Sequence, residues 1–170
     1  MNYFIIDFDS TFIKIESLDE LFRISNPFDN NLVEKINKIT SDGMDGKLSF
    51  TQSLSNRIEL LNASKDHIEE TINEIKGKVS DSFKSNDDFF KINKEYIYIV
   101  SSGFHEIIDP IAEEFGIIKN HIYANNFIFD NKGVVTGYDD KNALSMDKGK
   151  VEIIKNLKLN GTVHVLGDGY

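Results

Sequence analysis

Two carboxylates lie two residues apart near the start of the sequence, where they could attack a phosphate or hold a metal ion. Asp7 and Asp9 follow the short apolar run Tyr3–Ile6, which is typical of a buried strand. Paired carboxylates can supply a nucleophile, a proton donor or a ligand for a divalent cation. An isolated pair is more often a loop with a helix cap, and such pairs also occur in calcium loops and sugar-nucleotide transferases. A calcium loop needs glycine at its sixth position, where this sequence has Phe12.

Three further polar clusters strengthen the chemical interpretation. Ser101 and Gly103 follow the apolar run 96–100 and offer a hydroxyl and a backbone amide to an anion. Asp168 lies between two glycines after a third apolar run, and Lys148 supplies a positive charge. Each cluster alone has an ordinary explanation as a turn, a cap or a surface lysine. Together they predict a cation site of hard oxygen ligands beside a phosphate-binding cradle, which is the chemistry of phosphoryl transfer.

The elements that must position these groups alternate between strands and helices along the sequence. This pattern predicts an α/β fold, with a Rossmann-like parallel sheet that has helices on both faces and ligands at the carboxyl ends of its strands. From residue 16 to residue 80 the pattern is only helical, with four apolar stripes, which exceeds what a crossover needs. We therefore predict an α/β core formed by residues 1–15 and 81–170 and an inserted helical cap formed by residues 16–80. A hairpin is expected over 127–135 and a helix from residue 148.

The composition excludes several classes of function. The 170 residues include no cysteine, which rules out a disulfide scaffold, a thiolate zinc site and a cysteine nucleophile. Lys plus Arg number 19 against 28 Asp plus Glu, a net charge of −9, so no nucleic-acid partner is expected. No apolar run is long enough for a membrane span, and the start lacks the pattern of a secretory signal. We therefore expect no membrane partner and a cytoplasmic location.

Four stretches resemble, in order, the four motifs of the haloacid dehalogenase-type phosphatases: DFDST from residue 7, VSSGF from residue 100, MDKGK from residue 146 and GDGY from residue 167. Within that superfamily the sequence resembles the phosphoserine phosphatases, notably in the cap stretch MDGKLSFTQSLSNRIELL from residue 44. The resemblance covers essentially the whole sequence. It implies hydrolysis of O-phospho-L-serine to serine and phosphate, the last step of serine biosynthesis, with Mg²⁺ as cofactor.

The resemblance also implies a role for each residue of the predicted site. Asp7 would attack the phosphorus and form an aspartyl-phosphate. Asp9 would protonate the leaving alkoxide and then deprotonate the incoming water. Mg²⁺ would be held by Asp7, by the backbone carbonyl of Asp9 and by Asp168. The groups that hold the phosphate oxygens would be Ser101, Gly103 and Lys148.

Substrate choice is expected to come from the cap. The resemblance implies that Glu16 receives the substrate ammonium, that Arg57 binds its carboxylate and that Phe50 packs over it. Independently, Arg57 lies on an apolar stripe with Leu54 and Leu61, where a charge is costly unless it is paired. A guanidinium matches a carboxylate with two bonds, which lysine cannot do. The alternatives are a structural ion pair or a side chain that reaches solvent for Arg57, and plain core for Phe50.

Two departures from the resemblance leave other functions open. Position 102 is serine where the resemblance leads us to expect glycine. The sequence stops at Tyr170, where the resemblance implies a further acid and another strand, so we expect it to be truncated at its C-terminus. The alternatives are a phosphatase for another small phosphate ester, such as phosphohomoserine, and a non-catalytic phosphatase-like module of a longer protein. The partners that remain open are a second copy of the chain and a fused dehydrogenase domain.

Overall fold

A four-stranded parallel sheet forms the centre of the computed structural model, which describes residues 1–168. Gly169 and Tyr170, the end of the GDGY stretch, lie outside the described residues. The strand order is β3-β2-β1-β6, and all three pairings are parallel, as predicted. The expected hairpin is confirmed as a separate antiparallel pair, β4 with β5. The strands are β1 (Asn2–Ile6), β2 (Ile97–Phe104), β3 (Ile122–Asn125), β4 (Phe127–Phe129), β5 (Val135–Tyr138) and β6 (Thr162–Leu166).

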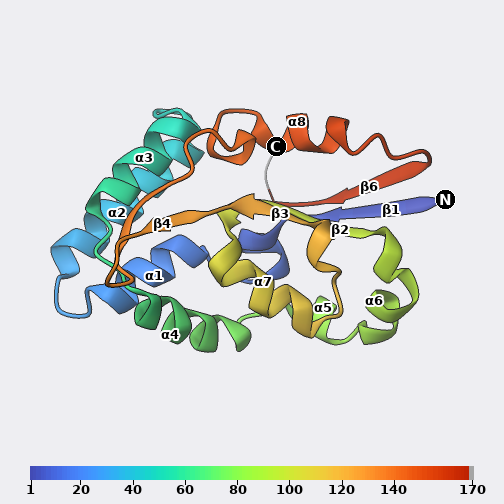
Figure 1. Cartoon of the computed structure of the whole chain (residues 1–170), viewed down its shortest axis with the longest axis horizontal. Helices are drawn as coiled ribbons and strands as arrows, with labels where there is room; N and C mark the ends of the chain where they lie inside the picture. Colours follow the sequence, from blue (N-terminus) through green and yellow to red (C-terminus); the bar gives the residue numbers. More distant parts are fainter. Residues whose placement is uncertain (169–170) are drawn as a thin grey trace.

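Helices cover both faces of the sheet, which confirms the predicted α/β fold. Figure 1 shows α8 along one face and α5, α6 and α7 on the opposite side, with α1 to α4 gathered at one end of the molecule. The helices are α1 (Ser17–Ser25), α2 (Asn30–Met44), α3 (Phe50–Leu60), α4 (Lys65–Lys76), α5 (Asp81–Lys84), α6 (Asp87–Asn93), α7 (His105–Glu114) and α8 (Gly149–Asn156). Within residues 1–168, none of them combines the length and the apolar character that crossing a lipid bilayer requires.

The central strands are apolar on both faces because helices cover both faces. Successive side chains of a strand point to opposite sides of a sheet. Ile5 and Val100 accordingly pack toward the face covered by α8, where they meet Ile154. Ile6 and Ile99, each one residue away from those positions, belong to the larger core on the other face. This two-sided burial fixes the register of β1 and β2, and with it the position of the polar residues that follow them.

Helices α1 to α4, the helices of the predicted cap, fall within residues 16–80, the stretch that the sequence predicted to be only helical. Asp29 caps α2 by accepting a hydrogen bond from the Leu32 N–H at 3.0 Å. Ser49 and Gln52 form a reciprocal capping box at the start of α3, with both bonds at 3.1 Å. Ser64 is the N-cap of α4, and its backbone N–H donates to His67 Nδ1 at 3.1 Å. The division of the chain into a core and a cap domain at residues 16 and 80 stays a prediction.

The structure corrects two boundaries that matter for the site. β2 continues beyond its predicted end to Phe104, because the polar residues that suggested a turn are buried: Ser101 is 1% exposed, and Phe104 pairs with Asn125 of β3. β3 itself is a strand that we did not predict. The helix expected from residue 148 begins at Gly149, and Lys148 is its N-cap in the left-handed region, with φ 64°.

Candidate active site

Asp7 lies where β1 ends, at the edge of the sheet where parallel strands place their ligands. Its backbone N–H donates to the Leu166 carbonyl at 2.9 Å, and its Oδ1 accepts from the Phe8 N–H at 2.8 Å. A Cβ added to Gly167 would lie 3.6 Å from the Cβ of Asp7. The end of β6, which leads into Asp168, therefore lies directly beside Asp7.

Asp9 is held in a tight turn after β1. The turn contains Ser10 with φ 54°, a left-handed conformation that is uncommon for residues other than glycine. Asp9 Oδ1 accepts from the Ser17 N–H at 2.7 Å. Burial, aided by the negative charge of Glu16, raises the pKa of Asp9 to about 7, and the hydrogen bond from Ser17 opposes this rise. A carboxyl group with a pKa near neutrality can both give and take a proton at physiological pH.

Glu16 lies next to Asp9 at the start of α1. Its Oε1 accepts from the Ser10 hydroxyl at 2.6 Å. Burial raises the pKa of Glu16, as do the negative charges of Asp19 and Asp168, whereas the Ser10 hydrogen bond and the positive charge of Arg57 lower it. Glu16 thus lies within a cluster of carboxyl groups that includes Asp9 and Asp168. Such a cluster favours the binding of a positively charged group.

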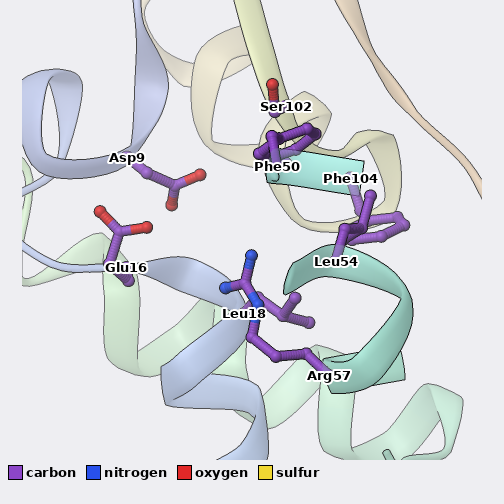
Figure 2. Close-up of a pocket in the computed structure, with 9 residues that line it drawn as sticks. Asp9, Glu16, Leu18, Phe50, Leu54, Arg57, Ser102 and Phe104 are labelled. Atoms are coloured by element: carbon purple, nitrogen blue, oxygen red, sulfur yellow. The ribbon is translucent and has the colours of Figure 1, made fainter. Parts of the chain in front are cut away.

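A small pocket opens between the strand ends and the helices α1 and α3. Figure 2 shows Asp9 and Glu16 on one side of it and Phe50 and Arg57, both from α3, on the other. Its volume is about 50 Å³ and it is partly open to solvent, so it encloses only part of a small molecule. The structure therefore brings together five of the residues predicted from the sequence. The lining residues are Asp9, Glu16, Leu18, Phe50, Leu54, Arg57, Ser102, Gly103 and Phe104.

The last residues of β2 form the wall of the pocket opposite α1. The Gly103 N–H donates to Ser101 Oγ at 2.9 Å, so the hydroxyl accepts from the backbone and keeps its own proton for another acceptor. A Cβ on Gly103 would lie 3.0 Å from Asp9 Oδ2 and 3.2 Å from Ser101 Oγ. Ser102, the departure from the resemblance, lines the pocket, and its carbonyl accepts from Asn125 Nδ2 at 2.9 Å. Asn125 is fully buried, and nothing in the pattern of the sequence predicted this role.

The lysine that contacts Asp7 is Lys150, whereas the lysine that the sequence predicted beside the phosphate is Lys148. Lys150 Nζ forms an ion pair with Asp7 Oδ2, and Lys148 is exposed at the N-cap of α8. The position of α8 is fixed by Gly149, where a Cβ would lie 1.8 Å from the Ala143 carbonyl oxygen. Lys150 therefore reaches Asp7 from the first turn of α8, whereas Lys148 precedes the helix and is exposed.

Two contacts fix the position of helix α3, one near its start at Phe50 and one near its end at Arg57. The Phe50 N–H donates to Asp147 Oδ1 at 2.8 Å, a link between the cap helices and the loop before α8 that the sequence did not predict. Arg57 is 7% exposed, and its Nη1 lies 3.4 Å from Asp19 Oδ1. Burial raises the pKa of Asp19, and the positive charge of Arg57 opposes that rise. The ion pair that we weighed from the sequence is thus present, on an arginine that also lines the pocket.

The expected Mg²⁺ site rests on two carboxylates and one backbone carbonyl. Within residues 1–168, no three His, Cys, Asp or Glu side chains lie close enough together to hold a metal ion. The two expected side chains, Asp7 and Asp168, follow the paired strands β1 and β6. The third expected ligand is the backbone carbonyl oxygen of Asp9. Oxygen donors of this kind fit the preference of a hard cation such as Mg²⁺.

Comparison with known proteins points to one group. No family model matches the sequence. The phosphoserine phosphatase of Methanocaldococcus jannaschii is 31% identical over 173 residues, which span 97% of this chain and 76% of that protein. The chloroplastic phosphoserine phosphatase of Arabidopsis thaliana is 28% identical over 166 residues, or 96% of this chain. The chain spans only 55% of the Arabidopsis protein and 60% of the phosphoserine phosphatase of Drosophila melanogaster.

Solved structures give the same result. A phosphoserine phosphohydrolase-like protein from Francisella tularensis superposes with a TM-score of 0.87 at 31% identity, over 100% of this chain and 79% of that one. A substrate-bound phosphoserine phosphatase complex gives 0.78 at 26% identity, over 99% of this chain and 79% of that one. A phospho-aspartyl intermediate analogue of phosphoserine phosphatase gives 0.72 at 27% identity, over 98% and 78%.

Proposed function

Because this chain belongs to the phosphoserine phosphatase family of haloacid dehalogenase-type hydrolases, we propose that it hydrolyses O-phospho-L-serine to serine and phosphate. The observation that carries the proposal is the pocket of Figure 2, in which Asp9, Glu16 and Arg57 converge. Phosphoserine presents an ammonium, a carboxylate and an ester oxygen that must be protonated as it leaves. The pocket offers one matching side chain for each of these three groups.

The reaction is proposed to proceed in two steps at Asp7 and Asp9. A carboxylate oxygen of Asp7 attacks the phosphorus, and the bond from phosphorus to the serine oxygen breaks as Asp9 gives that oxygen its proton. In the second step a water molecule attacks the phosphorus of the aspartyl-phosphate while Asp9 takes a proton from it. The bond to Asp7 breaks, which releases phosphate and restores both carboxyl groups to their initial state.

Mg²⁺ is the cofactor that the family generally uses, and the oxygen ligands at the strand ends suit it. We propose that it is held by the carboxylates of Asp7 and Asp168 and by the backbone carbonyl of Asp9. When bound, the ion offsets the negative charges of the nucleophile and the phosphate. The hydrogen bond from the Asp7 N–H to the Leu166 carbonyl supports this assignment, since it brings the end of β6 and the residues that follow it to the side of the nucleophile.

The phosphate is proposed to lie against the end of β2. The Ser101 hydroxyl keeps a free proton for a phosphate oxygen, because its oxygen already accepts from Gly103. The amide of Gly103 is thus engaged, and the residue also contributes by leaving space beside Asp9. The family resemblance gives the role of the phosphate-binding cation to Lys148. The contact with Asp7 supports Lys150 instead, and we assign the role to Lys150.

Recognition of the serine portion is proposed to lie in α1 and α3. Glu16 would receive the ammonium, since its carboxyl lies beside Asp9 at the mouth of the pocket. Arg57 would receive the carboxylate through the fork of its guanidinium. Phe50 would cover the substrate, because it lines the pocket and its backbone is fixed by Asp147.

Release of inorganic phosphate from O-phospho-L-serine with Mg²⁺ tests the proposal. We expect turnover by the wild type and none by Asp7→Asn, which removes the nucleophile with little change of shape. Asp88→Asn, an exposed position on α6, is the matched control and should keep full activity. Equal phosphate release by the wild type and Asp7→Asn would contradict the proposal.

A panel of phosphate esters tests the assignment of Arg57. Losing a hydrogen bond to a charged group costs about 1.5–3 kcal/mol, so Arg57→Ala should lower kcat/KM for phosphoserine by about 10- to 10²-fold. Esters without a carboxylate should be unaffected. The matched control is Arg23→Ala, because Arg23 is the other arginine of the sequence and pairs with Glu20 at the surface. An equal loss with every ester would mean that Arg57 does not bind the carboxylate.

The remaining expectations are a cytoplasmic location and a partner in the form of a second copy or a fused dehydrogenase domain. They stay predictions. Fractionation of cells and the native mass of the full gene product would test them.

A further inference from the structure

Arg57 is anchored on the side that faces away from the pocket. Its Nη1 lies 3.4 Å from Asp19 Oδ1 and 3.4 Å from Thr40 Oγ1, and its Nε donates to the Ser53 carbonyl at 3.3 Å. A buried guanidinium needs such partners, because removing its charge from water is costly. These contacts come from α1, α2 and α3, so the position of the guanidinium depends on how three helices pack together.

Asp19 and Thr40 are also bonded to each other. The Thr40 hydroxyl donates to Asp19 Oδ1 at 2.9 Å, which leaves its oxygen as the acceptor for Arg57. Thr40 is 8% exposed, and the Asp19 side chain is 19% exposed. The Thr40 hydroxyl thus donates to Asp19 and accepts from Arg57. The two side chains therefore act on Arg57 as a single hydrogen-bonded unit.

The ion pair leaves part of the guanidinium for another anion. A saturated pair between arginine and a carboxylate is bidentate, with both bonds near 2.7–2.9 Å. Here a single nitrogen faces Asp19 at 3.4 Å, and within residues 1–168 Nη2 donates no hydrogen bond. Figure 2 shows the guanidinium directed toward the space between Glu16 and Phe50. Its remaining N–H groups thus face the pocket.

We propose that Asp19 and Thr40 are positioning residues that hold Arg57 in the orientation that selects a carboxylate-bearing phosphate ester. This inference rests on the proposed function, in which Arg57 binds the substrate carboxylate. Asp19 and Thr40 do not touch the substrate. They fix one side of the guanidinium so that its other side presents a preformed donor edge, which lowers the entropy cost of binding.

Two esters that differ only in the carboxylate test this inference. O-phospho-L-serine and O-phosphoethanolamine share the phosphate and the ammonium, and only the first has a carboxylate. We expect Asp19→Asn and Thr40→Val to raise KM for phosphoserine about tenfold and to change its kcat by less than about twofold. Both parameters for phosphoethanolamine should stay within about twofold of the wild type. Thr40→Ser keeps the hydroxyl and should restore the wild-type KM.

The same comparison made by calorimetry in an Asp7→Asn background gives a readout that does not need turnover. There the dissociation constant of phosphoserine should rise about tenfold with Asp19→Asn, and that of phosphoethanolamine should not change. Melting temperatures identify a variant that fails to fold, and Asp19→Asn, which keeps the shape of the side chain, is then decisive.

Three results would overturn the inference. Equal losses for both esters would show a general structural role, and an unchanged preference for phosphoserine in both variants would show that Arg57 needs no positioning. A wild type that binds the two esters equally well would overturn the proposed substrate together with this inference. If the wild type prefers phosphoserine, the proposed substrate is supported, and the variants alone then test whether Asp19 and Thr40 position Arg57.

Discussion

Gly103→Ala is a small substitution at the point where the proposed acid–base residue and the phosphate-binding hydroxyl approach β2. The added Cβ would lie 3.0 Å from Asp9 Oδ2, 3.0 Å from Ile108 Cδ1 and 3.2 Å from Ser101 Oγ. Ordinary contacts begin near 3.4 Å, so these neighbours must move by a few tenths of an ångström. Two of the three atoms belong to the proposed catalytic machinery, and their displacement misaligns the proton donor and the phosphate donor together.

We expect Gly103→Ala to lower kcat for phosphoserine about 10²-fold, since misplacing a reacting group or losing one aligned donor costs about that much. Overpacking should cost about 1–3 kcal/mol of stability, which lowers the melting temperature by roughly 2–12 °C for a chain of this size. Phosphate release at saturating substrate and thermal melting measure the two effects. Activity should therefore fall far more than the loss of folded protein explains.

Gly137→Ala is the matched control for this substitution. Gly137 also lies in a strand, β5, and a Cβ there would meet nothing within 4 Å. This variant should keep wild-type kcat. If Gly103→Ala kept full activity with a lowered melting temperature, the proposed arrangement of Asp9 and Ser101 around the phosphate would be wrong.

Three further predictions concern α8 and the buried acid of α7. Because Lys150 contacts the nucleophile, Lys150→Met should lower kcat more than about tenfold, and Lys148→Met should lower it less than about threefold. Steady-state kinetics measures both effects. The reverse order would assign the phosphate-binding charge to Lys148. Gly149→Ala should lower the free energy of unfolding by about 3 kcal/mol or more, since its Cβ would lie 1.8 Å from the Ala143 carbonyl oxygen. Urea denaturation measures this loss. A smaller loss would show that α8 can move to make room for the Cβ. Burial raises the pKa of Glu106 above its ordinary value of 4.5, so the folded state binds this proton more tightly than the unfolded state does. The stability of the wild type should therefore fall as pH rises from 4.5 through the raised pKa. Glu106→Gln should make this slope shallower in denaturation measured from pH 4.5 to 8, because Asp9, Glu16 and Asp19, whose pKa values burial also raises, account for the rest. An unchanged slope would assign all of it to those groups.

The sheet and the cap helices could be predicted because their signals are local. Apolar runs such as Tyr3–Ile6 indicated buried strands, and the apolar stripes of residues 16–80 indicated helices. β3 was missed because its short sequence, IYAN, ends in a polar residue that the structure buries. The early end predicted for β2 has the same cause, since Ser101 is a polar residue that the fold buries.

The site could be predicted in part, because strand ends of a parallel sheet meet at one edge. That rule placed Asp9 and Gly103 together, and the structure has both in one pocket. Partners supplied from distant elements had no local signal. Asp19 and Thr40 are ordinary polar residues in the sequence, and only the packing of α1, α2 and α3 brings them to Arg57. The direction of the lysines at α8 likewise depends on how Gly149 packs.

The central claim is that Asp7 takes up the phosphoryl group of the substrate. Rapid acid quenching of the enzyme during turnover of phosphoserine, followed by digestion and mass spectrometry, tests this directly. The peptide that contains Asp7 should gain the mass of one phosphoryl group on that side chain, and the gain should be absent in Asp7→Asn. Turnover with no phosphorylated Asp7 peptide at any quench time, or with the phosphoryl group on another residue, would contradict the claim.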